Sequence, residues 1–186
     1  DPEMSRGLGD VYKRQIEGDS TFVKELLTDG KCDIAFLRSE SSSVKEFNSI
    51  PYMIDYLTAV LPATHPLAKA DNLPFEQLRG ETFLLFPEHS FINDLCIREC
   101  RNAGFEPHIA YTGNRGATLI DLVRNGAGIT LMMHHSARQE NDSSLAFIPV
   151  TPGIYSYISL NYAKEKPLSP QAESFVRYVK AHKRDF

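Results

Sequence analysis

A single arginine, Arg38, directly follows the short apolar run CDIAFL at residues 32–37. Such a continuous run is typical of a parallel strand that is buried on both faces. Ligands of open α/β sheets gather at the carboxyl ends of these strands, and a guanidinium there can bind a carboxylate through two parallel hydrogen bonds. Arg38 is therefore a candidate anion-binding residue, and a solvated loop charge is the alternative.

Three expected helix starts supply further polar groups. Asp19 or Ser20 can cap one helix, Ser90 a second and Asn114 a third. The free backbone N–H groups at a helix start favour an anion. Plain capping is the alternative for Ser20 and Asn114. His134 follows the apolar run ITLMM.

Other chemistries find little support. Cys96 and Cys100 are four residues apart, and His89 is near them in the sequence, but zinc sites usually need a third and a fourth ligand at tight spacing. A Gly-x-Ser-x-Gly elbow is absent. The Gly-rich NGAGI segment at 125–129 lacks the Lys-Ser/Thr of a phosphate loop and marks a helix end with a tight entry to a strand. We expect no metal, no cofactor and no enzymatic activity.

The amino-acid composition limits the classes of partner that the protein is expected to bind. The 186 residues carry a net charge of −4 without a basic stripe, so small molecules or proteins are expected rather than nucleic acid. No apolar run approaches the roughly 20 residues of a membrane span. Three cysteines are too few and too irregular for a disulfide framework and fit a reducing cytoplasm.

Expected strands and helices alternate along the chain, which favours parallel sheets covered by helices. In the last helix Ser169 is the expected cap, and Phe175, Val176 and Val179 are expected in the core. The expected strands lie at 32–37, 56–62, 82–86, 107–113, 127–133, 144–150 and 155–163, and the expected helices at 18–30, 72–80, 90–104, 114–126 and 168–183.

The segments KCDIAFLR, YLTAVLPATHPLA and LVRNGAGITLMM, in this order and spacing, resemble the effector-binding domain of LysR-type transcriptional regulators. The similarity extends over about 16–183. It implies an α/β fold of two Rossmann-like lobes joined by crossing strands, as in type 2 periplasmic binding proteins. Lobe I would comprise 16–67 and 149–186, lobe II would comprise 68–148, and the effector would lie between them. The resemblance implies that the ligand-binding residues beside Arg38 are Ser20, His89, Ser90, Phe91, Ile92, Asn114, Thr118 and His134. A surface position is the alternative for His89.

The resemblance also implies partners. The effector would be a small molecule and is expected to be a carboxylate, because one branch of the family has an arginine at the position of Arg38. Contact with DNA would be made only by an N-terminal winged helix-turn-helix that this chain lacks, and the intact protein would be a cytoplasmic homodimer or homotetramer, with the helix around 117–125 in its interface. A transporter's solute-binding protein is the alternative with the same fold.

The first residues do not fit this family. SRGLGDVYKRQ, at 5–15, stands where the domain normally has a strand and a helix. It can be encoded by codons that read as a transposase-based sequencing adapter. Residues 1–15 are therefore expected to be a non-native tail on a domain that is truncated at its start, and a divergent native tail is the alternative.

Overall fold

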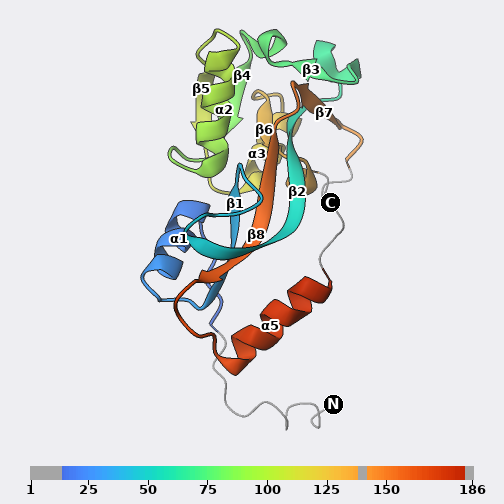
Figure 1. Cartoon of the computed structure of the whole chain (residues 1–186). Helices are drawn as coiled ribbons and strands as arrows, with labels where there is room; N and C mark the ends of the chain where they lie inside the picture. Colours follow the sequence, from blue (N-terminus) through green and yellow to red (C-terminus); the bar gives the residue numbers. More distant parts are fainter. Residues whose placement is uncertain (1–13, 138–141, 183–186) are drawn as a thin grey trace.

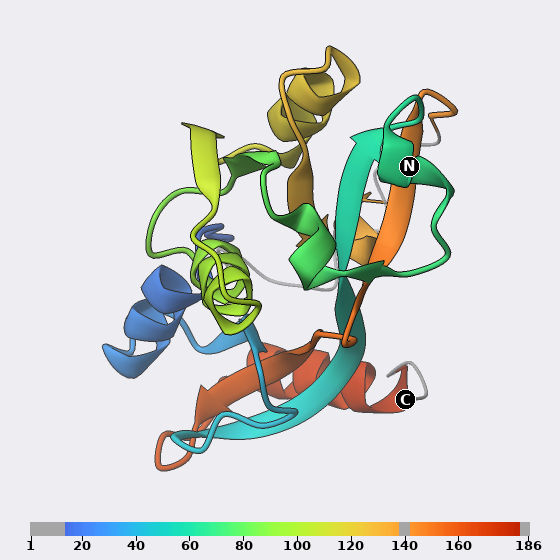
Figure 2. The same ribbon diagram turned by 90° about the horizontal axis from the view of Figure 1, so that it is seen from above.

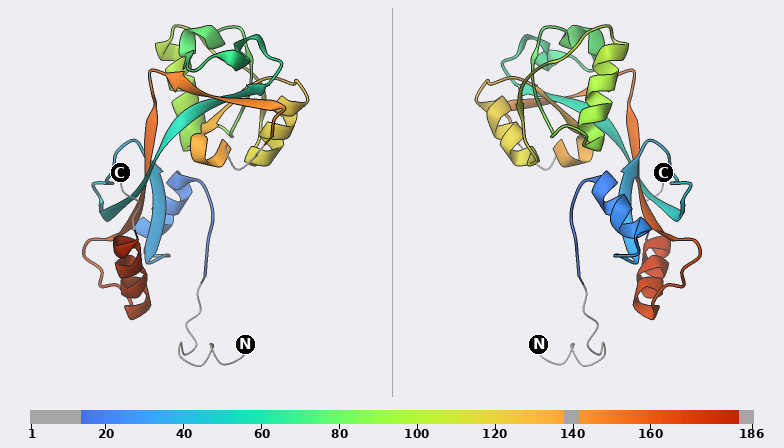
Figure 3. Two further views of the ribbon diagram at one scale, coloured as in Figure 1. Left: turned by 90° about the vertical axis from the view of Figure 1, so that its right-hand side faces the viewer. Right: turned by 90° about the vertical axis from the view of Figure 1, so that its left-hand side faces the viewer.

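A computed structural model of the chain describes residues 14–137 and 142–182, and two lobes lie one above the other in Figure 1. One strand, β2 (Phe47–Pro62), runs through both lobes, and the chain returns through β7 (Leu145–Thr151) and β8 (Tyr155–Ala163). Figure 3 shows that β2 and the return of the chain from β7 into β8 cross a narrow waist between the lobes. The predicted α/β fold of two lobes joined by crossing strands is confirmed. The predicted tail at 1–15 lies almost wholly outside the described residues.

The lower lobe in Figure 1 contains one helix on each face of a small sheet. Its elements besides β2 and β8 are α1 (Ser20–Thr28), β1 (Ile34–Ser39) and α5 (Pro170–Ala181). The upper lobe, seen from above in Figure 2, contains the remaining elements. These are the 3₁₀ helices η2 (Pro66–Lys69) and η3 (Phe75–Leu78), the strands β3 (Leu73–Pro74), β4 (Thr82–Leu85), β5 (His108–Thr112) and β6 (Thr130–Met133), and the helices α2 (Phe91–Asn102), α3 (Gly116–Arg124) and α4 (His134–Ala137).

Strand β2 changes its partners at the waist. Its residues from Phe47 to Tyr56 pair with β8, whereas those from Leu57 to Pro62 pair with β6 and β7. Pairing through β2 therefore links the sheets of the two lobes into one path. We propose these changes of partner, between 56 and 57 and between 151 and 155, as the lobe boundaries in place of the predicted 67/68 and 148/149.

The prediction of parallel sheets is wrong for most of the pairings. Strand β1 pairs antiparallel with β8, and β2 pairs antiparallel with β6, β7 and β8. Within residues 14–137 and 142–182, parallel pairing is confined to β3 with β7, β4 with β5, and a bridge between Phe83 and Ile129. The antiparallel pairings follow from the central place of β2. Strands β6, β7 and β8 all lie beside it and run in the opposite direction.

The upper lobe buries two continuous clusters. The larger contains Leu57, Leu131 and Phe83, and it extends to Cys96 and Cys100 on α2. The smaller joins α3 to β6 through Leu119, Ile120 and Val123. Gly128 shapes the entry to β6, because its φ is +156° and a Cβ there would collide with the carbonyl oxygen of Thr82. The predicted role of NGAGI as a helix end with a tight strand entry is confirmed.

The lower lobe has a smaller core on each face of its sheet. Leu27 of α1 packs against Ala35 and Leu37 on one face, and α5 packs its Val176 and Val179 on the other. The prediction that residues 32–37 are buried on both faces is wrong, because Phe36 is 41% exposed beside Phe175 and Tyr52. Phe175 itself is 43% exposed, so its predicted core position is also wrong. Both rings lie at the rim of the contact between α5 and the sheet.

Most of the helix caps follow the sequence. The side chains of Asp19, Ser90 and Ser169 accept hydrogen bonds from the first turns of α1, α2 and α5. The predicted cap at Asn114 is wrong, because Arg115 occupies the N-cap position of α3 and its side chain makes no capping hydrogen bond. The helix starts at Gly116, two residues after Asn114.

Candidate ligand-binding site

Arg38 lies near the end of β1, where it meets both crossing strands. Its Nη1 donates to Oγ of Ser156 on β8 at 2.6 Å, and its Nη1 and Nη2 lie 3.4 and 3.3 Å from Oδ2 of Asp55 on β2. The Arg38 side chain is 17% exposed. Burial lowers the pKa of Arg38 from its ordinary value, and the neighbouring Asp55 carboxylate opposes that shift. Arg38 therefore carries its charge in a largely enclosed position.

Asp55 connects the two lobes through one buried carboxylate. Its Oδ2 faces Arg38, while its Oδ1 accepts from the backbone N–H groups of Tyr56 and His135, each at 3.0 Å. The side chain is only 2% exposed. A buried charge is stable only when it is paired and hydrogen-bonded, and these donors come from β1, β2 and the first turn of α4. Asp55 thus fixes the position of Arg38 relative to the upper lobe.

His134 lies on the upper-lobe side of the same junction. Its ring stacks on Tyr56 with centroids 4.3 Å apart, and its Nδ1 lies 3.3 Å from Oγ1 of Thr58. The Ser156 hydroxyl donates to the sulfur of Met133 at 3.2 Å. These contacts bring His134 to the same strands that hold Arg38.

The starts of α1 and α2 meet at one side chain. Asp19 Oδ1 accepts from the N–H of Thr21 in its own helix at 2.8 Å, and Oδ2 accepts from the N–H of Phe91 at 3.3 Å. Figures 1 and 2 agree in placing α1 and α2 on the same side of the molecule. Ser20 is adjacent, and its Oγ accepts from the backbone N–H of Arg38 at 3.2 Å. Two helix starts and Arg38 therefore form one continuous group, which we call the junction group: Asp19, Ser20, Arg38, Asp55, Phe91, His134 and Ser156.

The other predicted ligand-binding residues have different surroundings. His89 is exposed with a φ of +65°, and the Ser90 hydroxyl accepts from the N–H of Asn93 as a helix cap. Phe91 and Ile92 pack against the larger core cluster of the upper lobe. Asn114 is exposed and Thr118 is half-buried near the start of α3, and no hydrogen bond described for 14–137 or 142–182 joins either to the junction group. Their roles as ligand contacts stay predictions.

Sequence reasoning did not select Asp55 and Ser156 as site residues, and it treated Asp19 only as a cap. Asp55 had a detectable signal, because it is the one acidic residue within the long apolar strand YMIDYLTAV. Ser156 had none, since small polar residues are common in strands with one exposed face. The second role of Asp19 depends on a hydrogen bond that spans 72 positions of the sequence.

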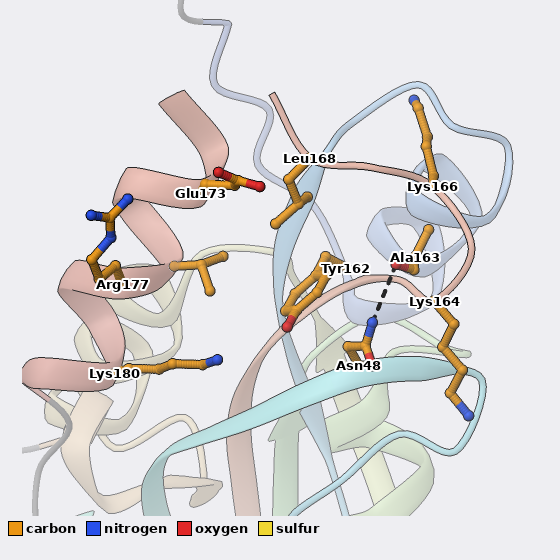
Figure 4. A pocket seen from close by; sticks show the side chains of 10 residues that line it. Asn48, Tyr162, Ala163, Lys164, Lys166, Leu168, Glu173, Arg177 and Lys180 are labelled. Atoms are coloured by element: carbon orange, nitrogen blue, oxygen red, sulfur yellow. Dashed lines mark hydrogen bonds between the residues drawn. The ribbon is translucent and has the colours of Figure 1, made fainter. Parts of the chain in front are cut away.

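A separate cavity of about 450 Å³ lies at the far end of the lower lobe, between α5 and the end of β8 (Figure 4). Its basic side chains do not converge on one point. Lys180 points toward Tyr162, but Lys164 Nζ donates to the carbonyl of Lys45 at 2.7 Å and Lys166 Nζ lies 3.7 Å from Asp33. The cavity therefore lacks the geometry of a built anion site.

Metal and membrane chemistry gain no support from the part of the chain that the structure describes. Within it, no three His, Cys, Asp or Glu side chains are placed to share a metal ion. Within the same residues, no helix is both long and apolar enough to span a bilayer. Cys32, Cys96 and Cys100 are all free thiols.

Comparison with known proteins agrees with this fold. Residues 14–184 match the family described as the LysR substrate binding domain. The regulatory domain of Synechocystis PCC6803 CcmR, in a structure with 2-PG, superposes with a TM-score of 0.80 at 16% identity, over 90% of this chain and 81% of that one. The effector binding domain of QuiR, in complex with shikimate, gives a TM-score of 0.71 at 20% identity, over 90% and 81% of the two chains. The chain belongs to the LysR substrate-binding domain family, and its fold is the type 2 periplasmic-binding-protein-like fold.

Curated relatives point to the same family. The transcriptional dual regulator GltC of Bacillus subtilis (strain 168) is 26% identical over 164 residues, which are 88% of this chain and 55% of GltC. The chain spans about half the length of the curated relatives it matches. The chain is thus an effector-binding domain of the type found in LysR regulators, which are transcription factors rather than enzymes.

Proposed function

We propose that the chain binds a small anionic effector at the junction group and passes that signal to a DNA-binding segment elsewhere in a longer cytoplasmic protein. The observation that carries the proposal is the meeting of Arg38 with two helix starts at one place between the lobes. A guanidinium and free helix N–H groups are complementary to a carboxylate. The similar CcmR regulatory domain, in a structure with 2-PG, and the QuiR effector binding domain, in complex with shikimate, support a small molecule as the ligand.

The Arg38 guanidinium is held more loosely by Asp55 than by Ser156. The distances from Arg38 to Asp55 Oδ2, 3.3 and 3.4 Å, are long for a charge-assisted hydrogen bond, whereas the distance to Ser156 Oγ is 2.6 Å. If a ligand carboxylate draws the guanidinium away, Asp55 keeps its hydrogen bonds from Tyr56 and His135. His89, Ser90, Asn114, Thr118 and His134 are proposed as further contacts from the upper lobe.

Signalling requires two states with different affinities for the effector. The Asp55 carboxylate contacts β1 on one side and α4 on the other. A ligand that moves Arg38 would therefore change how the upper lobe is held against the lower lobe. We propose that this change alters subunit packing in a homodimer or homotetramer that includes α3, and hence the position of the DNA-binding segments.

The test is calorimetric titration of this chain with shikimate and a panel of small carboxylates, with Arg38→Ala as the variant and Arg177→Ala as the matched control. Arg177 lines the separate cavity of Figure 4. We expect Arg38→Ala to weaken binding by at least about tenfold, the loss for one charged hydrogen-bonded contact, and Arg177→Ala to leave it unchanged. Equal binding by wild type and Arg38→Ala would refute the site. Loss of binding in Arg177→Ala alone would show that the anion binds in the separate cavity instead.

Circular dichroism of each variant at the titration temperature checks that it is folded. Arg38→Lys provides a second, milder change, because it keeps the charge but loses the bidentate geometry. Its affinity is expected to lie between those of wild type and Arg38→Ala.

A further inference from the structure

We propose that Asp19 is an internal carboxylate latch. In the absence of ligand its side chain bridges the two lobes, and an anionic effector competes with it for the start of α2. This inference rests on the proposed function, because it assumes that the effector is an anion at the junction group. An N-cap normally satisfies only its own helix. Asp19 instead divides its two oxygens between Thr21 in the lower lobe and Phe91 in the upper lobe.

The N–H group that Asp19 binds is one that a ligand would use. At the start of α2, the N–H of Asn93 donates to Ser90 Oγ and that of Asp94 donates to the Ser90 carbonyl. This leaves the N–H groups of Phe91 and Ile92 for acceptors outside the helix. The Asp19 carboxylate takes the first of them, so it occupies the position of an effector carboxylate at this helix.

The latch is reversible because Asp19 is exposed and its hydrogen bond to Phe91, at 3.3 Å, is longer than its bond to Thr21, at 2.8 Å. Release from α2 leaves the cap of α1 intact. An incoming anion can then replace Asp19 without unfolding either helix.

A second pair of side chains also joins the lobes but does not touch the start of α2. Arg98, in the middle of α2, donates to both oxygens of Glu40 at 2.7 and 2.9 Å. Both side chains are about half exposed, at 46% and 55%, and exposed pairs contribute little. Glu40 therefore supplies the matched control, since its removal breaks a contact between the lobes without vacating the Phe91 N–H.

The first experiment compares Asp19→Asn and Asp19→Ser with Glu40→Gln in titrations with shikimate. Asn and Ser cap a helix as well as Asp does, but neither carries a charge and the Ser side chain is too short to span the lobes. We expect both Asp19 variants to bind shikimate at least about fivefold more tightly, the lower end of typical coupling between sites. We expect Glu40→Gln to bind within about twofold of wild type. Unchanged or weaker binding by both Asp19 variants would overturn the competition.

The second experiment needs no ligand. Spin labels at Glu25→Cys on α1 and Arg101→Cys on α2, in a Cys32→Ser background, report the separation of the lobes by pulsed electron paramagnetic resonance. We expect the distance distribution to broaden toward longer distances in Asp19→Asn and Asp19→Ser. Unaltered distributions in both variants would overturn the latch. If no carboxylate binds any variant, the anionic effector of the proposed function fails, while these distances still decide whether Asp19 holds the lobes.

Discussion

The two lobes share a strand but differ in how much apolar surface they enclose. Among the described residues, the upper lobe buries clusters of sixteen and eight residues, whereas the lower lobe buries only four on each face of its sheet. Most of the large exposed aromatic rings of the described residues lie in the lower lobe, among them Phe22, Phe36, Phe175 and Tyr178, although Tyr111 is exposed in the upper lobe. Because burial of apolar area is the main source of stability, the upper lobe is the firmer of the two. The site therefore joins a rigid half to a more easily opened half.

The rate of thiol labelling should differ more between the two lobes than any other property. Cys32 in the lower lobe is only partly buried, while Cys96 and Cys100 in the upper lobe are buried. Burial raises the pKa of all three, well above the ordinary value for Cys96 and to about 12 for Cys100. Since the thiolate is the reactive form, we expect Cys32 to react with iodoacetamide at pH 8.5 more than about a thousandfold faster, the factor for opening a core worth about 5 kcal/mol. Mass spectrometry of the labelled peptides measures each rate, and equal rates would mean that the upper lobe opens as readily.

Core truncations should also differ between the lobes. Leu131 on β6 is fully buried in the sixteen-residue cluster, and Leu27 on α1 is 2% exposed in a cluster of four. We expect Leu131→Ala to lower the free energy of unfolding by about 4–5 kcal/mol and Leu27→Ala by about 2–3 kcal/mol, the two ends of the usual range. Urea denaturation followed by circular dichroism provides both values. Losses of the same size would show that the small cluster is as tightly packed as the large one.

Removal of one helix cap should lower stability by the same amount in each lobe. The hydroxyls of Ser90 on α2 and Ser169 on α5 both accept from the third residue beyond them at 3.3 Å. Each Ser→Ala substitution should lower the free energy of unfolding by about 1 kcal/mol. Hydrogen exchange of the amides then shows where the loss falls. We expect Ser169→Ala to speed exchange in the lower lobe alone, and faster exchange throughout would mean that the lobes unfold as one unit.

The smallest expected effect is a pH-dependent change in stability that arises from Asp142 in the upper lobe. Hydrogen bonds from the Ser144 backbone and hydroxyl, and then from Arg124, lower the pKa of Asp142 from 3.8 to about 2. Because folding favours the charged form, the contribution of Asp142 is complete above about pH 4 and is lost as the pH falls through about 2. Asp142→Asn should therefore lower the urea midpoint at pH 7, and its difference from wild type should shrink between pH 4 and pH 2. A difference that is constant with pH would contradict this assignment.

The sequence predicted the helices and strands well but not their partners. Caps such as Ser90 and Ser169 are local, so residue type and spacing reveal them. The apolar run before Arg38 does not reveal whether its neighbour runs parallel or how far α5 covers Phe36, because both depend on segments more than 100 residues away. The junction group follows the same rule. Arg38 could be selected from its place at a strand end and Asp55 as the one acidic residue of an apolar strand, whereas Ser156 becomes visible only when β2 and β8 cross.

The shared strand limits how the domain can move. Strand β2 belongs to one sheet up to Tyr56 and to the other from Leu57 onward. Sliding one lobe past the other would break the strand pairing on both sides of that point, whereas bending there would strain mainly the hydrogen bond from the Leu57 N–H to the Ile154 carbonyl, at 2.8 Å. Bending between residues 56 and 57 is therefore the less costly of the two motions. A ligand bound close to this point needs to shift atoms only slightly to swing the outer ends of the lobes through a much larger arc.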